Sequence, residues 1–140
     1  MLKRTMIQLY FAHGTGDCEE AMEFYQKAFG GKKLNEHRAG INDPYHIEGD
    51  IVHAEMDIFG QIFTFSEIVY TADELVRGNG TEFWFHFEKG QIDEGHKAYN
   101  VLKEGAKEIP KFATDNDDGF WNEWCFCVTD KYGITWGLFC

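Results

Sequence analysis

The stretch that decides the fold is residues 6–31, MIQLYFAHGTGDCEEAMEFYQKAFGG. It opens with an apolar run that ends at Ala12 and predicts a β-strand. After a Gly-Thr-Gly turn, Asp17 and Glu20 have the spacing of a capping box, which predicts the start of a helix. Apolar residues then recur every three or four positions, so one helix face is apolar. The glycine pair at the end of the stretch predicts where the helix stops.

The same order of elements recurs in the second half of the chain. The first half continues with a short strand near residues 33–37 and a hairpin of strands 51–58 and 61–68. The second half predicts a strand at 82–88, a helix at 92–104, and strands at 120–129 and 134–140 around a turn at 130–133. This repeat predicts a single α+β domain over residues 1–140, built from two similar modules at about 1–75 and 76–140.

Length, composition and charge narrow the possible functions. The chain has 140 residues, of which 44% are hydrophobic and 16% aromatic, so it has enough apolar surface to fold as one domain. Its formal net charge of -11 repels nucleic acids and anionic membranes, and neither is expected as a partner. No signal peptide or membrane span is predicted. The cysteines form no CxxC pair and are expected to be free thiols in the cytoplasm; they are Cys18, Cys125, Cys127 and Cys140.

Three motifs carry a resemblance to a known family. They are residues 19–31 (EEAMEFYQKAFGG), residues 53–56 (HAEM) with Gly60 and Ser66, and residues 119–121 (GFW) with 130–136 (DKYGITW). With these motifs the chain resembles the PhnB-like branch of the glyoxalase, bleomycin-resistance and extradiol dioxygenase superfamily, often called vicinal oxygen chelate proteins. The resemblance implies a glyoxalase-like fold in which two paired βαβββ modules enclose a cleft, usually within a homodimer.

The resemblance also implies where a metal would bind. Metal-dependent members hold a divalent ion in the cleft with four ligands, and the nearby motifs carry those positions to Leu9 or Gln8, Thr64, Glu82 and Gly137. Of these only Glu82 is a good ligand, because a hard divalent cation needs several carboxylate, imidazole or carbonyl donors together. The sequence therefore departs from the metal-binding pattern, and we expect neither the usual metal nor another cofactor.

Two strands supply polar side chains for the expected cleft. In strand 51–58 the alternation puts His53, Glu55 and Asp57 on the face opposite the apolar one, where a shielded histidine beside carboxylates can act as a general base or bind a polar ligand. On the next strand Thr64 and Ser66 share a face and are expected to line the same cleft. The alternative for all five residues is an ordinary solvated strand face.

The first strand of the second half alternates in the same way. Three phenylalanines fall on one face, and Glu82, Trp84 and His86 fall on the other. A tryptophan beside a few polar groups is typical of a small-molecule site. The alternative is that Trp84 belongs to the core. The predicted ligand pocket is therefore His53, Glu55, Asp57, Thr64, Ser66, Glu82, Trp84 and His86.

Three functions remain open from the sequence. The first is a small-molecule-binding protein that uses this pocket without the usual metal, and its acidic residues favour a cationic or hydrogen-bond-donating ligand. The second is a metal-dependent lyase, isomerase or dioxygenase with a rebuilt site made of His53, Glu55, Glu82 and His86. The third is a dimeric interaction protein whose cleft is filled by its own side chains.

Overall fold

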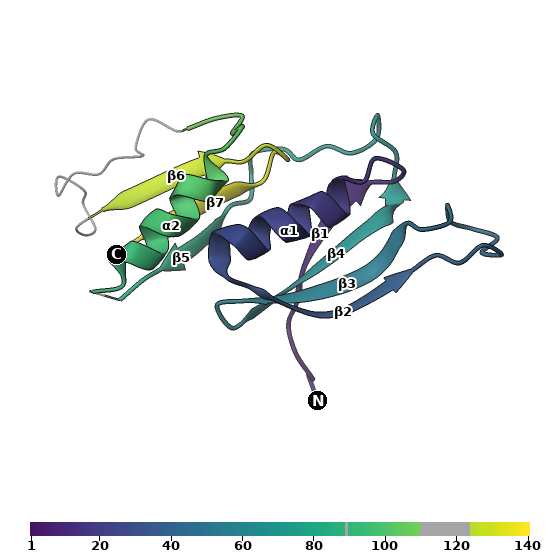
Figure 1. The fold of residues 1–140 in the computed structure, drawn as a ribbon, viewed down its shortest axis with the longest axis horizontal. Helices are drawn as coiled ribbons and strands as arrows, with labels where there is room; N and C mark the ends of the chain where they lie inside the picture. The colour runs from purple at the N-terminus through teal and green to yellow at the C-terminus, as the bar shows by residue number, and fades with distance from the viewer. Residues whose placement is uncertain (89, 110–123) are drawn as a thin grey trace. The chain divides into compact units, whose positions relative to one another are not determined.

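The structure is a computed structural model that describes residues 1–88, 90–109 and 124–140. The chain divides into two compact units, Met1–Val76 and Arg77–Cys140, and the described part of each unit contains one β-sheet and one α-helix (Figure 1). The α+β fold class predicted from the sequence is thus confirmed. No helix within the described ranges is long and apolar enough to cross a membrane.

The first unit is a four-stranded sheet with a helix on one face. Its strands are β1 (Ile7–Ala12), β2 (Lys32–Arg38), β3 (Ile51–Ile58) and β4 (Gln61–Tyr70). They lie in the order β1-β4-β3-β2, with β1 parallel to β4 and the other neighbours antiparallel. The helix α1 (Asp17–Phe29) lies across this sheet and contacts β1, β3 and β4 (Figure 1).

Aromatic side chains of α1 and the sheet form the core of the first unit. Tyr25 of α1 and Phe65 of β4 are completely buried, with their ring centroids 6.2 Å apart. Phe65 also stacks on Phe11 of β1, again at 6.2 Å. Strand alternation puts the buried Phe63 on the same face as Phe65. The middle of the face toward α1 is therefore apolar, and Thr64 between these phenylalanines points to the opposite face.

The ends of α1 agree only in part with the sequence-based expectation. Gly30 has the left-handed φ of 68° and donates its N–H to the Gln26 carbonyl at 2.8 Å, so the predicted glycine stop is confirmed. The predicted capping box is wrong, because the N-cap position is Gly16, with φ 77°, and Asp17 is the first helical residue. Thr15, one residue before the N-cap, accepts the Asp17 N–H with its Oγ1 at 3.2 Å and so satisfies one backbone donor of the first turn.

The second unit contains a smaller sheet of the same design. Its elements are β5 (Phe83–His86), α2 (Ile92–Leu102), β6 (Cys125–Thr129) and β7 (Thr135–Phe139). The strands lie in the order β5-β7-β6, with β5 parallel to β7 and β6 antiparallel to it. This order repeats the β1-β4-β3 part of the first sheet. A single bridge between Glu108 and Thr129 continues the pairing beyond β6, at the position that β2 has in the first sheet.

Two strands of the second unit differ in length from the sequence-based expectation. The strand expected at 82–88 is only four residues long in the structure. The strand expected at 120–129 begins at Cys125, and its predicted part at 120–123 lies outside the described residues. The Trp136 indole packs on Phe83 and Phe85, at 5.4 and 6.0 Å between ring centroids. Since Phe83 and Trp136 are in register, these rings share one face of the sheet.

The predicted turn at 130–133 is confirmed and is held by a buried aspartate. Asp130 Oδ1 accepts the backbone N–H groups of Tyr132 at 2.9 Å and Ile134 at 3.0 Å. Its other oxygen accepts the indole N–H of Trp136 at 2.8 Å. Gly133 has φ 83°, a backbone conformation that favours glycine. The turn therefore fixes both the hairpin of β6 and β7 and the orientation of Trp136.

Candidate functional site

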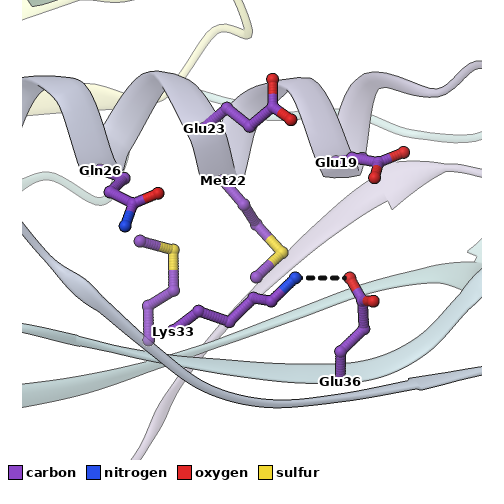
Figure 2. A pocket seen from close by; sticks show the side chains of 7 residues that line it. Glu19, Met22, Glu23, Gln26, Lys33 and Glu36 are labelled. Carbon is purple, nitrogen blue, oxygen red and sulfur yellow. Dashed lines mark hydrogen bonds and ion pairs between the residues drawn. The ribbon is translucent and has the colours of Figure 1, made fainter.

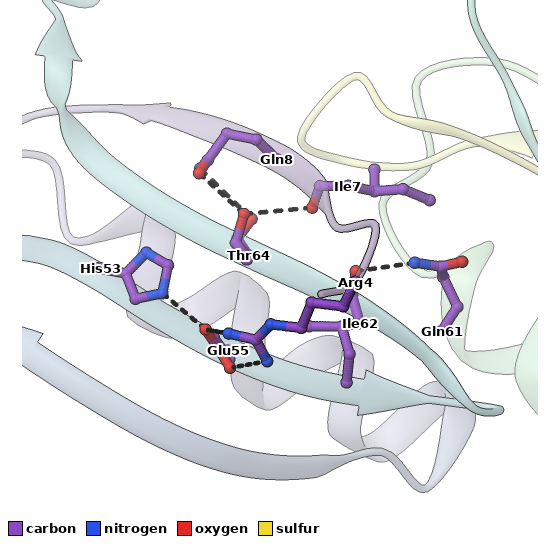
Figure 3. A network of polar contacts seen from close by, with 8 residues as sticks. All are labelled: Arg4, Ile7, Gln8, His53, Glu55, Gln61, Ile62 and Thr64. Carbon is purple, nitrogen blue, oxygen red and sulfur yellow. Dashed lines mark hydrogen bonds and ion pairs between the residues drawn. The ribbon is translucent and has the colours of Figure 1, made fainter. Parts of the chain in front are cut away.

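Four polar side chains form a row across the first sheet, on the face opposite α1. The strand register pairs Gln8 of β1 with Thr64 of β4, Thr64 with Glu55 of β3, and Glu55 with Asn35 of β2. Residues paired directly across neighbouring strands point to the same face of a sheet. Figure 3 shows Gln8, Thr64 and Glu55 on this face, with helix behind the sheet. We call it the open face of the first sheet.

Most of the predicted residues of the first unit lie on this open face, as the alternation indicated. Thr64 is only 2% exposed, Glu55 4% and Ser66 5%, although all three are polar. Polar groups buried to this degree need hydrogen-bond partners. Asp57 differs in role, because its Oδ1 accepts the Gly60 N–H at 2.7 Å and so closes the turn between β3 and β4. Asp57 is therefore at least in part a turn residue.

Glu55 is the charged centre of the open face. Arg4 donates to both of its oxygens, from Nη1 at 3.0 Å and from Nη2 at 2.6 Å, and His53 Nε2 lies 3.0 Å from Oε1 (Figure 3). The Arg4 guanidinium, followed by the His53 ring, holds the pKa of Glu55 at about 2, below its ordinary value of 4.5, although burial acts in the opposite direction. Glu55 is thus a carboxylate throughout the physiological range.

Arg4 is a site residue that sequence reasoning missed. It precedes β1 and belongs to no strand, and it lies 51 residues from Glu55 in the chain. No periodicity or motif links two residues at such a distance. The only signal in the sequence is the presence of cations near the start of an otherwise acidic chain.

The other end of the row settles which residue of β1 faces outward. Thr64 Oγ1 donates to Gln8 Oε1 at 2.8 Å, and Gln8 Nε2 donates to the Leu9 carbonyl at 3.0 Å. Leu9 itself is buried with the core on the other face. Of the two positions that the family resemblance left open on this strand, only Gln8 reaches the open face. An amide and a hydroxyl that bond each other therefore stand where the superfamily implies metal ligands.

The second sheet has an open face of a different kind. Trp84 of β5 is in register with Gly137 of β7, and its indole lies directly on that glycine. A Cβ atom at Gly137 would come within 2.0 Å of Trp84 Cδ2. Glu82 lies outside β5 and accepts the Trp84 indole N–H at 2.9 Å. Because the indole remains 40% exposed, the alternative that assigned Trp84 to the core is wrong.

Aromatic rings continue along this second open face. His86 stacks on Phe139 with ring centroids 4.2 Å apart and an interplanar angle of 11°. Cys127 is in register with Gly137 and fully buried, and burial, more than the neighbouring acidic groups, raises the pKa of its thiol to about 12. Cys127 is thus a protonated packing residue at neutral pH. None of the four cysteines forms a disulfide, and all four are buried.

The residues that the structure describes do not fit a divalent metal. Within the described ranges there is no group of three or more His, Cys, Asp or Glu side chains arranged to hold a metal ion. A cation at Glu55 would have to displace the Arg4 guanidinium from both carboxylate oxygens. At Gly137 a ligand side chain would overlap the Trp84 ring.

A second buried carboxylate lies on the side of the first sheet that faces α1. Glu67 alternates with Ser66 along β4, and its Oε1 accepts the Ile51 backbone N–H at 2.8 Å. Burial raises the pKa of Glu67 above its ordinary value. Since Glu67 is 4% exposed and holds the start of β3, we assign it a structural role rather than a place in the candidate site.

A pocket of about 250 Å³ lies between α1 and β2 (Figure 2). It is lined by Glu19, Met22, Glu23, Gln26, Lys33, Glu36 and Met56. Its rim carries ion pairs, with Lys33 Nζ 3.1 Å from Glu36 and Arg38 2.9 Å from Glu19. Arg38 also donates hydrogen bonds to Glu36, and these are the main cause that lowers the pKa of Glu36. Sequence analysis did not predict this pocket, and none of the eight predicted pocket residues lines it.

The contacts of Glu55 predict how stability depends on pH. Because folding lowers the pKa of Glu55, its contribution is complete above its unfolded value of 4.5 and is lost as pH falls toward about 2. Glu55→Gln should therefore lower the thermal unfolding midpoint at pH 7, and the gap to wild type should close across this acidic range. A gap that stays constant between neutral pH and pH 3 would contradict the Arg4–Glu55 assignment.

The contact between Trp84 and Gly137 makes a second prediction. Gly137→Ala should lower the free energy of unfolding by about 1–3 kcal/mol, because the new methyl group overlaps the indole. In a Trp84→Ala background the same change should cost much less, and urea denaturation of the two single variants and the double variant measures the difference. Additive effects would show that the indole does not lie on Gly137.

Comparisons with known proteins support the fold. No family model matches the sequence, and no curated protein matches it either. Among solved structures, a PhnB protein from Bacillus cereus is 22% identical, with 99% of this chain and 100% of that chain covered and a TM-score of 0.78. Protein PA1353 from Pseudomonas aeruginosa is 19% identical, with 96% and 95% covered and a TM-score of 0.71.

A third similar structure contains a metal. The fosfomycin resistance protein FosX from Listeria monocytogenes, complexed with Mn(II) and a sulfate ion, is 13% identical, with 99% of this chain and 92% of that chain covered and a TM-score of 0.61. At these identities the comparisons establish the fold alone. The chain thus shares the fold of these PhnB and FosX structures, as the resemblance carried by its sequence motifs predicted.

Proposed function

We propose that this chain is a PhnB-like member of the superfamily that binds a small molecule without the divalent metal usual there. The observation that carries the proposal is the nature of the two in-register pairs on the open faces, Gln8 with Thr64 and Trp84 with Gly137. In neither pair does a side chain offer a carboxylate, an imidazole or a thiolate, and the one amide oxygen, Gln8 Oε1, already accepts the Thr64 hydroxyl at 2.8 Å. Hard divalent cations prefer carboxylate and carbonyl oxygens, several at a time.

The pair in the second sheet supports the proposal through sterics as well as chemistry. FosX from Listeria monocytogenes was solved with Mn(II), so the same fold can hold a metal in another protein. In this chain the Trp84 ring fills the space that any side chain at Gly137 would need. The aromatic ring thus covers Gly137, one of the implied ligand positions, and the carboxylate of Glu82, another of them, is bonded to the indole N–H. Aromatic walls with a few fixed polar groups are typical of small-molecule sites.

The first sheet supplies fixed polar groups for such a ligand. Arg4 and His53 hold the Glu55 carboxylate, and Thr64 and Gln8 hold each other. Arg4 and His53 each have 41% of their side chain exposed, so Arg4 retains further N–H groups for a ligand and His53 retains its second ring nitrogen. We propose that this open face contacts the polar groups of the ligand, and that Glu82, Trp84 and His86 contribute to the same function. We further propose a homodimer located in the cytoplasm.

Ligand screening by thermal shift tests this function. A library of small metabolites and antibiotics is screened against wild type with and without a chelator, and each variant is compared with its own unliganded midpoint. We expect at least one compound to raise the midpoint equally in both conditions, and to lose most of that effect in Thr64→Val or Trp84→Ala. The matched control is Tyr45→Ala, an exposed aromatic in the first unit, which should keep the full shift.

Two outcomes would contradict the proposed function. One is a library in which no compound raises the unfolding midpoint of the wild type. The other is a shift that disappears when the chelator is present, because it would show that the ligand binds through a metal.

A further inference from the structure

The open face of the second sheet carries a corner formed by two aromatic rings. The Trp84 indole and the Phe139 ring meet at an angle of 68°, with their centroids 5.9 Å apart. Phe139 is braced on its own face by the parallel ring of His86 at 4.2 Å. We call the two rings Trp84 and Phe139 the aromatic corner. Its walls are held by their neighbours, so a ligand need not order them on binding.

The indole is fixed in place yet still accessible. One side of it rests on Gly137, where no side chain intervenes, and its N–H is bonded to Glu82 at 2.9 Å. Trp84 is 40% exposed, and a large aromatic side chain gains stability when more of its surface is buried. The structure therefore presents a π-face whose position is set by the sheet and by a carboxylate at its edge.

The surroundings of this corner are negatively charged. Glu82 lies at the indole edge. Cys127 lies beneath the same face, and burial is the main cause that raises the pKa of its thiol. The negative charges of Glu82 and Glu108 raise this pKa further. The chain as a whole carries a net charge of -11. Such a field attracts cations and repels carboxylates and phosphates.

We infer that the aromatic corner and Glu82 bind an organic ammonium ion, methylated or quaternary at its nitrogen. This inference rests on the proposed function and names the chemical class of its ligand. A cation over an aromatic face is attracted by the ring quadrupole, most strongly by tryptophan, and Glu82 supplies the opposite charge. A methylated nitrogen is preferred over a primary one, because the two rings offer no oxygen acceptor for ammonium N–H groups and one oxygen of Glu82 already accepts the indole N–H.

The test is an NMR titration of the indole N–H signals, using choline chloride and its neutral carbon isostere 3,3-dimethylbutan-1-ol at matched ionic strength. The Trp84 signal is identified as the one missing from Trp84→Phe. We expect choline to shift this signal and to bind at least about tenfold more tightly than the alcohol. Trp84→Ala and Glu82→Gln should each weaken choline binding, Trp84→Phe should retain part of it, and Tyr45→Ala should leave it unchanged.

Three results would overturn the inference. They are equal binding of choline and the alcohol, choline binding that survives Trp84→Ala, and no response of the Trp84 signal up to millimolar choline. A failure of this inference can be distinguished from a failure of the proposed function. A neutral or anionic compound that raises the unfolding midpoint through Thr64 or Trp84 would uphold small-molecule binding while overturning the assignment of an ammonium ligand.

Discussion

The candidate site depends on one constraint, the parallel pairing of β1 with β4 in the first sheet and of β5 with β7 in the second. It places Gln8 beside Thr64 in one unit and Trp84 beside Gly137 in the other. Because paired residues share a face, this register decides which side chains meet at the centre of each open face. A shift of one residue would bring the buried Leu9 to the surface in place of Gln8 and would turn Trp84 toward the core. The core packing of α1 and α2 on the opposite faces excludes that shift.

The open faces of the two sheets are covered by side chains of different chemistry. In the first sheet, the free-energy cost of burying the Glu55 charge is offset by two hydrogen bonds from Arg4 and by the contact with His53. This face is therefore polar, and its buried negative charge is paired with a positive one. In the second sheet, Trp84 and Phe139 supply aromatic surface, and Glu82 leaves a net negative charge at its edge. Neither face needs a metal to satisfy its groups.

Much of the fold and part of the site could be predicted from the sequence. Alternation along strand 51–58 assigned His53 and Glu55 to the open face, and the same pattern separated Trp84 from its phenylalanine neighbours. Contacts between distant segments could not be predicted, since Arg4 reaches Glu55 across 51 residues and lies in no periodic segment. The capping box failed because the helix begins one residue earlier than the box requires, with Gly16 at the N-cap and Asp17 already helical. The relation of Trp84 to Gly137 needed the strand register, which a single sequence does not specify.

Metal content is the most direct test of the claim that Trp84 and Gly137 leave no place for the usual divalent ion. Inductively coupled plasma mass spectrometry on protein purified without chelator measures it, with Glu82→Ala as the comparison. We predict divalent metal far below one equivalent per chain in wild type, with no further decrease in Glu82→Ala. A stoichiometric divalent ion in wild type that is lost in Glu82→Ala would contradict the claim and favour a metal-dependent enzyme.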